Sequence, residues 1–208
     1  MTSNSIPEII HQIWIGPKPR PVEWMQTWEQ MNPNMGYALW DEELLQDFGL
    51  RYKKQFDYLY SVGEYRGASD IARVEIIERL GGVYIDADSV CVKSIEDAPF
   101  MQTQFFVNKE FDHKRGEFKN RVQNAHIGAI PHHPIMTQYL DRIADFDVTT
   151  TDWMWIGGKT LTELINKQIM LLPICTFTPT NFDGRVAPQE GDTYAEHRWG
   201  TTKGTYAS

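Results

Sequence analysis

Short apolar runs alternate along the chain with segments of helical periodicity. The apolar runs at 6–16 and 37–40 are rich in the residues that form buried strands. Residues 22–31 and 42–48 have helical spacing instead, and Asp41 is placed to cap the second helix. This β-α-β-α order predicts an α/β protein with parallel strands in its sheet.

The middle of the chain has the most informative pattern. Apolar residues recur at helical spacing over 71–80, and Ser69 or Asp70 can cap this helix by accepting a first-turn N–H. Gly81-Gly82 ends it, because glycine adopts the left-handed conformation without a Cβ clash. Residues 83–85 are strong strand formers, so the sequence predicts a buried strand directly after the helix.

The remaining pattern predicts further elements of both kinds. We expect helices at 51–65, 135–143 and 160–168, strands at 89–92, 105–107, 124–130 and 171–177, a charged loop at 109–121 and a polar tail from 181. No repeat, low-complexity stretch or clear linker interrupts this order. One domain over residues 1–208 is therefore expected.

Asp86 and Asp88 follow the central strand and are the first candidates for chemistry. Two carboxylates this close repel one another unless a positive group lies between them, and a divalent metal is the simplest such group. An isolated acidic pair is a weak signal, since most such pairs lie in solvated loops. On the preceding helix, Asp70 and Arg73 share a face; they fit a functional pair and a structural ion pair equally well.

Composition limits the choice of partners. The formal net charge of −8 and the pI near 5.2 argue against nucleic acid as the main partner. Two cysteines, Cys91 and Cys175, are too few for a disulfide framework and favour a reduced compartment. Residues 1–7 are polar, with no signal peptide, and no apolar stretch is long enough to span a bilayer. We expect a cytoplasmic protein, for which peripheral membrane contact stays open.

Two further groups of residues are candidates for ligand contacts. His11, Gln12 and Trp14 end the first strand beside a Gly-Pro turn, which is a natural ligand edge in an α/β sheet; the simpler alternative makes Trp14 a core residue. Near the C-terminus, His197 is a candidate third metal ligand. Lys203 there is a candidate phosphate-binding residue, together with the hydroxyls of Thr201 and Thr202. The alternative is a frayed tail.

Four blocks of sequence, in this order, resemble the DXD-containing glycosyltransferases. The blocks are Ile9–Gly16, Ser69–Arg73, Gly81–Asp88 and Gly157–Thr162. The chain is most similar to glycosyltransferase family 32 and more loosely similar to the glucosylating domains of large clostridial toxins. The resemblance implies a GT-A fold, which is a single Rossmann-like α/β/α sandwich with a mixed central sheet. It also implies a nucleotide-sugar donor and a divalent metal, usually Mn²⁺.

The same resemblance implies a role for each matching residue. Trp14 would stack on uracil beside His11, Gln12 and Ile13, Asp70 and Arg73 would bind the donor sugar, and Tyr84 would lie near the nucleotide. Asp86 would contact ribose and metal, while Asp88 and His197 would bind the metal. Independently of the resemblance, Ala87 is a further candidate for nucleotide contact, and Lys203 or Arg198 would add positive charge as the tail closes. Two blocks depart from the family pattern. Residues 196–199 match its late His-rich, Trp-ending block only loosely, and Gly157-Gly158 replaces a common Gly-Pro.

The expected function is transfer of a hexose from a UDP-sugar to a glycan or another hydroxyl acceptor. The transfer would depend on Mn²⁺ or Mg²⁺, with Asp86, Asp88, Asp70 and Arg73 at the catalytic centre, and the resemblance implies retention of configuration.

Two alternatives remain open. Residues 84–90 also resemble the first motif of haloacid-dehalogenase-type phosphatases, in which Asp86 would be the nucleophile and Asp192 a later acid. The other alternative is a non-catalytic nucleotide- or carbohydrate-binding module. Trp153 and Trp155 fit an acceptor platform and ordinary packing equally well.

Overall fold

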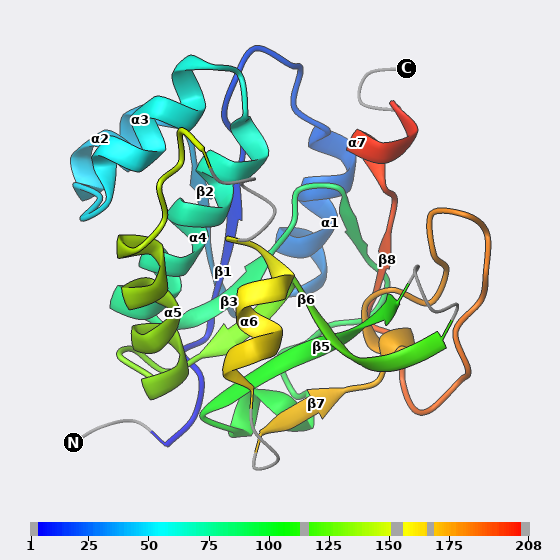
Figure 1. Ribbon diagram of the computed structural model, residues 1–208. Helices are drawn as coiled ribbons and strands as arrows, with labels where there is room; N and C mark the ends of the chain where they lie inside the picture. The colour runs from blue at the N-terminus through cyan, green and yellow to red at the C-terminus, as the bar shows by residue number, and fades with distance from the viewer. Residues whose placement is uncertain (1–3, 113–116, 151–155, 166–168, 205–208) are drawn as a thin grey trace.

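The protein is a mixed α/β structure built on one six-stranded sheet (Figure 1). The computed structural model describes residues 4–112, 117–150, 156–165 and 169–204. The strands, in the order in which they pair across the sheet, are β2 (Gly36–Trp40), β1 (Ile9–Ile13), β3 (Gly82–Ile85), β6 (Glu117–Ala129), β5 (Phe105–Asp112) and β7 (Met170–Leu172). Strands β2, β1 and β3 are parallel, β6 runs antiparallel to both β3 and β5, and β7 is parallel to β5. The mixed central sheet expected from the resemblance is therefore confirmed.

A second, two-stranded sheet joins distant parts of the chain. Strand β4 (Ser89–Cys91) pairs antiparallel with β8 (Ala195–His197), and Ser89 lies opposite His197. The pairing holds the C-terminal segment against the loop that follows β3.

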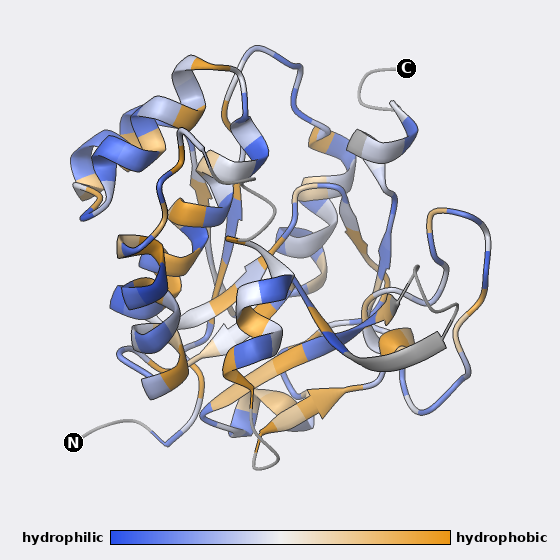
Figure 2. Ribbon diagram, in the orientation of Figure 1, coloured by the Kyte–Doolittle hydropathy of each residue, from blue (hydrophilic) through white to orange (hydrophobic). Residues whose placement is uncertain are grey.

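Helices cover both faces of the six-stranded sheet. The helices are α1 (Val22–Met31), α2 (Glu42–Phe48), α3 (Lys53–Ser61), α4 (Tyr65–Leu80), α5 (Pro134–Ala144), α6 (Gly158–Leu164) and α7 (Gly200–Lys203), with 3₁₀ turns at Pro99–Gln102 and Ile174–Thr176. Helices α2 to α6 share one apolar core, whereas α1 and the small sheet share the other. Figure 2 shows α5 with hydrophobic and hydrophilic residues on different sides, as expected for a helix packed on a sheet.

Strand β3 contributes to both cores, because successive side chains of a strand point to opposite faces. Tyr84 packs with the α4 core, whereas Val83 and Ile85 pack with the α1 core. All three side chains are almost completely buried. Full burial of each large apolar side chain stabilises the fold by about 1.5–3 kcal/mol. The strand that carries the acidic pair is thus fixed from both sides.

The glycine pair ends α4 as the sequence predicts. Gly81 has a φ of 66°, and a Cβ at this residue would lie 2.6 Å from Cδ of Pro131. Gly82 has a φ of 91°, and a Cβ there would lie 2.6 Å from Cγ2 of Ile9 on the neighbouring strand. Both positions need the backbone freedom and the small volume of glycine.

The start of α4 differs from the prediction. The helix begins at Tyr65, so neither Ser69 nor Asp70 is its cap. Gly63, with a φ of 80°, follows α3, and the chain re-enters a helix two residues later. Asp70 therefore lies inside the helix, and its carboxylate contacts other side chains instead of capping the first turn.

In the second half of the chain, several strands and helices begin or end at residues other than those predicted. Within the charged segment predicted as a loop at 109–121, residues 109–112 belong to β5 and residues 117–121 to β6, with Asp112 opposite Glu117. The strand predicted at 171–177 ends at Leu172, because Pro173 has no N–H for further pairing, and a 3₁₀ turn follows. The polar tail forms β8 and α7. Within the described part of the chain, no helix is both long and apolar enough to cross a membrane.

Candidate functional site

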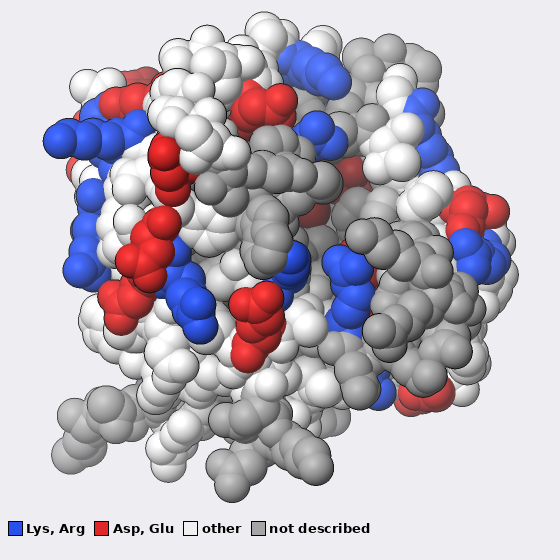
Figure 3. Space-filling view, viewed as in Figure 1, with Lys and Arg blue, Asp and Glu red and all other residues white. Residues whose placement is uncertain are grey.

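A cavity of about 700 Å³ opens at the carboxyl ends of β1 and β3. Ligands of open α/β sheets bind at this edge, where loops after neighbouring strands meet. The residues that line it include Ile13 at the end of β1 with Trp14 after it, Asp70 and Arg73 on α4, Asp86, Ala87 and Asp88 after β3, Gln123 and Asn124 on β6, and His197 at the end of β8 with Trp199 after it. Figure 3 shows acidic atoms recessed in a hollow of this face, with basic side chains above them.

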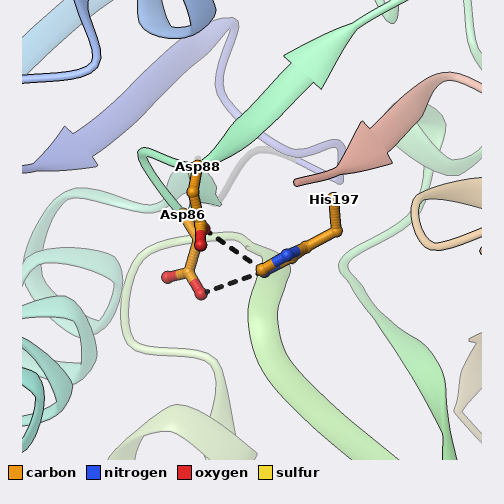
Figure 4. A group of neighbouring side chains, drawn as sticks. All are labelled: Asp86, Asp88 and His197. Atoms are coloured by element: carbon orange, nitrogen blue, oxygen red, sulfur yellow. Dashed lines mark ion pairs between the residues drawn. The ribbon is translucent and has the colours of Figure 1, made fainter. Parts of the chain in front are cut away.

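Asp86, Asp88 and His197 converge on one point of this cavity (Figure 4). Nε2 of His197 lies 3.6 Å from Oδ2 of Asp86 and 3.4 Å from Oδ1 of Asp88. One ligand atom from each residue lies within 4.8 Å of the other two. Two carboxylate oxygens and an imidazole nitrogen at this spacing form a donor set for a divalent ion such as Mn²⁺.

Backbone hydrogen bonds hold this cluster together. The amide of Arg198 donates to the backbone carbonyl of Asp88 at 2.7 Å, and the amide of Gly200 donates to Oδ2 of Asp88 at 2.8 Å. The amide of Trp199 donates to Nδ1 of His197 at 3.1 Å, so that Nε2 faces the carboxylates. The alternative of a frayed tail is therefore wrong for residues 195–203.

Arg73 links the helix to the acidic loop. It lies 3.0 Å from Asp70 and 3.1 Å from Asp86, and it donates to the carbonyl of Asn124 at 2.7 Å. Its guanidinium also covers the ring of Tyr84, whose hydroxyl donates to Asp86 at 2.9 Å. The pair of residues at helical spacing is thus part of a larger network that reaches the candidate metal ligands.

The network sets the charge of each carboxylate. Burial raises the pKa of Asp70 to about 6, against the opposing effect of Arg73. Burial also acts to raise the pKa of Asp86, but Arg73 and His197 outweigh it and hold this pKa well below its usual range. For His197, burial lowers the pKa, and the neighbouring Asp88 and Asp86 reverse the effect and raise it. Asp86 is therefore ionised whenever the protein is folded near neutral pH.

Most of the residues selected from the sequence lie at this cavity. Ile13, Trp14, Asp70, Arg73, Tyr84, Asp86, Ala87, Asp88 and His197 all line it. Trp14 is half-buried, and its Nε1 donates to the carbonyl of Lys18 at 2.8 Å. Trp14 is thus a partly exposed aromatic residue in the wall of the cavity.

Three selected residues do not line the cavity. His11 is fully buried: its Nδ1 accepts from Trp40 at 3.1 Å, and its Nε2 lies 3.0 Å from the carbonyl of Gly81. Gln12 is also fully buried and accepts from the hydroxyl of Tyr37 at 2.7 Å. These contacts tie β1 to its neighbours, and neither side chain is free to face a nucleotide.

Lys203 is the third of these residues. It is exposed at the end of α7, and the residue of this helix that lines the cavity is Thr202. Trp153 and Trp155, the candidate acceptor platform, lie outside the described residues.

Asn124 is a cavity residue that the sequence alone does not single out. Its side-chain amide donates to Oδ1 of Asp70 at 2.9 Å, while its carbonyl accepts from Arg73. It lies on β6, which pairs with β3 through residues 82–85. Only that antiparallel pairing brings Asn124 beside the α4 residues, and no local pattern encodes it.

The phosphatase alternative requires a later acidic residue near Asp86. Asp192, its candidate, does not line the cavity and forms an exposed ion pair with Lys93 at 2.7 Å. The arrangement around Asp86 therefore lacks the acidic partner that this alternative assigned to Asp192.

Solved structures identify the class of the fold. The structure is similar to the PaToxG glycosyltransferase with a TM-score of 0.63 over 77% of this chain and 69% of that chain, at 19% sequence identity. Together with the mixed sheet and the acidic loop after β3, this likeness defines a GT-A fold.

Sequence comparison shows which part of the chain matches a known protein family. Residues 19–106 match the family described as "Glycosyltransferase sugar-binding region containing DXD motif". An uncharacterized glycosyltransferase of Acanthamoeba polyphaga mimivirus is 33% identical over 62% of this chain and 52% of its own length. A mannosyl phosphorylinositol ceramide synthase of Saccharomyces cerevisiae is 26% identical over 68% and 36%, respectively. The chain thus spans about half, or less, of the length of these relatives. The resemblance to DXD-containing glycosyltransferases is confirmed.

Proposed function

We propose that the protein is a metal-dependent glycosyltransferase that moves a hexose from a UDP-sugar to a hydroxyl group of a glycan or related acceptor. The observation that carries the proposal is the convergence of Asp86, Asp88 and His197 in a cavity that Trp14 and Asp70 also line. A site of this kind offers a flat aromatic surface for a base, ligands for a cation between phosphates, and hydrogen-bond acceptors for a sugar.

The donor set fits Mn²⁺ or Mg²⁺, and the nitrogen of His197 favours Mn²⁺. Asp86, Asp88 and His197 would hold the ion. When bound, it would neutralise the charge that develops on the departing diphosphate. Apart from the ion, Arg73 provides positive charge in this network, and it forms ion pairs with Asp70 and Asp86.

The remaining residues bind and orient the donor. Trp14 would stack on uracil, Asp86 would also contact the ribose, and Asp70 would accept hydrogen bonds from sugar hydroxyls while Arg73 and Asn124 keep its carboxylate in place. The bond from C1 to the phosphate oxygen breaks, and a bond from C1 to the acceptor oxygen forms. The hydroxyl proton leaves with the nucleoside diphosphate. Retention of configuration rests on the family resemblance.

Calorimetric titration of UDP into the protein, with Mn²⁺ and then with EDTA, tests the proposal directly. We expect binding that requires the metal, followed by slow hydrolysis of one member in a screen of nucleotide sugars. The screen should include a mannose donor, because the name of the yeast relative specifies mannosyl transfer. Lack of UDP binding in both conditions would favour the binding-module alternative or another nucleotide.

Replacing Trp14 by alanine should weaken UDP binding by about 1–3 kcal/mol, since this is the range for stacking of a base on an aromatic side chain. The thermal midpoint should change little, because the ring is half-buried and lies at the cavity. Trp24→Ala is the matched control, a second half-buried tryptophan that does not line the cavity. Gross unfolding of Trp14→Ala would instead identify Trp14 as a core residue.

The affinity for the donor should fall as the pH drops through about 6. Asp70 has a pKa raised to about 6, so it is ionised above this value and becomes protonated below it. A protonated carboxyl accepts the sugar's hydrogen bonds less well. Protonation of His197 competes with the metal and weakens the binding of UDP and of the donor alike, so the quantity to measure is the ratio of donor affinity to UDP affinity. This ratio should fall below about pH 6 in the wild type and stay low at every pH in Asp70→Asn. A wild-type ratio that does not change with pH would contradict the assignment.

A further inference from the structure

His126 is a fully buried histidine that lies next to the candidate metal site without lining the cavity. It is on β6 opposite Ile85 of β3, the last strand residue before the acidic loop. Its ring stacks on Phe177 with 4.7 Å between ring centroids and an angle of 11°. On its other side the ring meets that of His197 edge-on, at 5.9 Å and 78°. The imidazole of His197 is therefore supported from the interior of the protein by a second imidazole.

The same residue supports the acidic loop. Nε2 of His126 lies 3.0 Å from the hydroxyl of Ser89, the residue directly after Asp88. The amide of Ser89 donates to the carbonyl of Asp86 at 3.0 Å, and Ser89 is the partner of His197 in the β4–β8 pairing. One side chain thus contacts both segments that carry the three candidate metal ligands.

The contribution of His126 to the stability of the fold does not by itself explain why a histidine occupies this position of β6. Nδ1 of His126 is fully buried and has no hydrogen-bond partner among the described residues. A buried polar group without a partner costs about 1–3 kcal/mol. Phenylalanine would keep the stacking on Phe177 and avoid that cost, but it would lose the contact with Ser89. Phenylalanine therefore cannot replace the hydrogen bond between the imidazole of His126 and the loop residue Ser89.

We propose that His126 is a positioning residue of the metal site, which fixes the ring of His197 and the loop 86–89 in one geometry. The proposal rests on the metal-dependent function proposed above. Groups behind a metal ligand set its orientation, and their loss commonly lowers metal affinity by about 10- to 100-fold. Because His126 contacts the loop of both carboxylates as well as the ring of His197, its loss should weaken the binding of Mn²⁺ and of Mg²⁺.

The test measures the affinities for Mn²⁺ and Mg²⁺ on the whole chain in the presence of UDP, by calorimetry or by electron paramagnetic resonance of free Mn²⁺ with Mg²⁺ as competitor. In His126→Phe, we expect the affinities for Mn²⁺ and for Mg²⁺ both to fall about 10- to 100-fold. His126→Gln, which retains a polar group towards Ser89, should recover part of both affinities. When His197→Ala is already present, His126→Phe should lower the Mn²⁺ affinity by a smaller factor than it does in the wild type.

His133→Phe is the matched control. His133 also stacks on a phenylalanine, Phe105, at 4.9 Å and 20°, but it caps α5 and does not line the cavity. It should leave both metal affinities unchanged. Near-ultraviolet circular dichroism checks that the variants are folded, and His126→Gln carries the test if His126→Phe is not folded.

Two results separate this inference from the proposed function. No loss of either metal affinity in His126→Phe, or a loss that His126→Gln does not partly restore, would overturn the positioning role. A wild-type chain that binds neither ion with UDP would overturn the metal-dependent function itself.

Discussion

Replacing Asp88 by alanine is expected to abolish metal-dependent UDP binding. Asp88 is almost fully buried, and its Oδ1 lies 3.4 Å from Nε2 of His197. Removal of a charged ligand leaves Asp86 and His197, too few groups to hold the ion in place. We expect the calorimetric signal of UDP with Mn²⁺ to fall to that measured with EDTA.

A structural effect of the same substitution has to be separated from the loss of a ligand. Oδ2 of Asp88 accepts from the amide of Gly200 at 2.8 Å, so alanine also removes a contact with the first residue of α7. Asp88→Asn keeps an oxygen for this contact but loses the charge, and it should fail to bind the metal as well. Asp192→Ala removes an exposed acid outside the cavity and should bind UDP normally. Unchanged Mn²⁺-dependent affinity in Asp88→Ala would contradict the site.

Replacing Arg73 by methionine should destabilise the fold by about 3–5 kcal/mol in the absence of metal, the range for removing one partner of a buried ion pair. The Arg73 side chain is only 6% exposed and forms ion pairs with both Asp70 and Asp86. Methionine fills a similar space but leaves Asp70 without this counter-charge and Asp86 with only His197 beside it. Urea denaturation followed by fluorescence measures the free energy of unfolding.

Two further variants define what Arg73 contributes. Arg73→Lys keeps the positive charge but has no planar fork to bridge several acceptors, so it should lose an intermediate amount of stability. Arg142→Met, at an exposed position of α5, should stay within about 0.5 kcal/mol of wild type. An Arg73→Met protein as stable as wild type would mean that the carboxylates are neutral or solvated in the folded state.

The sequence predicts the fold best where the pattern is local. Helices α1 and α2 have the predicted bounds, and Asp41 caps α2 by accepting from the amide of Leu44. The strand 83–85 and the glycine stop before it were also predictable, because glycine and β-branched residues each have a direct conformational preference. The loop that carries Asp86 and Asp88 follows from these elements alone.

Other features depend on pairing between distant segments. The strands predicted at 105–107 and 124–130 lie in β5 and β6, but the charged residues 109–112 and 117–121 have no alternation that marks a strand, so the full length of β5 and β6 is not predicted. The β4–β8 pairing brings His197 to the acidic loop, and the β3–β6 pairing brings Asn124 and His126 to their places. His11 and Gln12 show the opposite case. They directly precede the cavity residues Ile13 and Trp14 in the sequence, but both side chains are buried and form hydrogen bonds with neighbouring residues instead of lining the cavity.

The β4–β8 pairing also bears on how the protein is made. The acidic loop is complete early in translation, whereas Gly200, which contacts Asp88, is 112 positions further along the chain. A nascent chain can therefore assemble β1, β2 and β3 while its carboxylates still lack His197. Closing a loop of this length costs more conformational entropy than pairing nearby strands, so we expect the Asp86–Asp88–His197 cluster to be completed after β1, β2 and β3 have paired. Newly synthesised protein would then pass through a stage in which part of the sheet is formed but the candidate site is not.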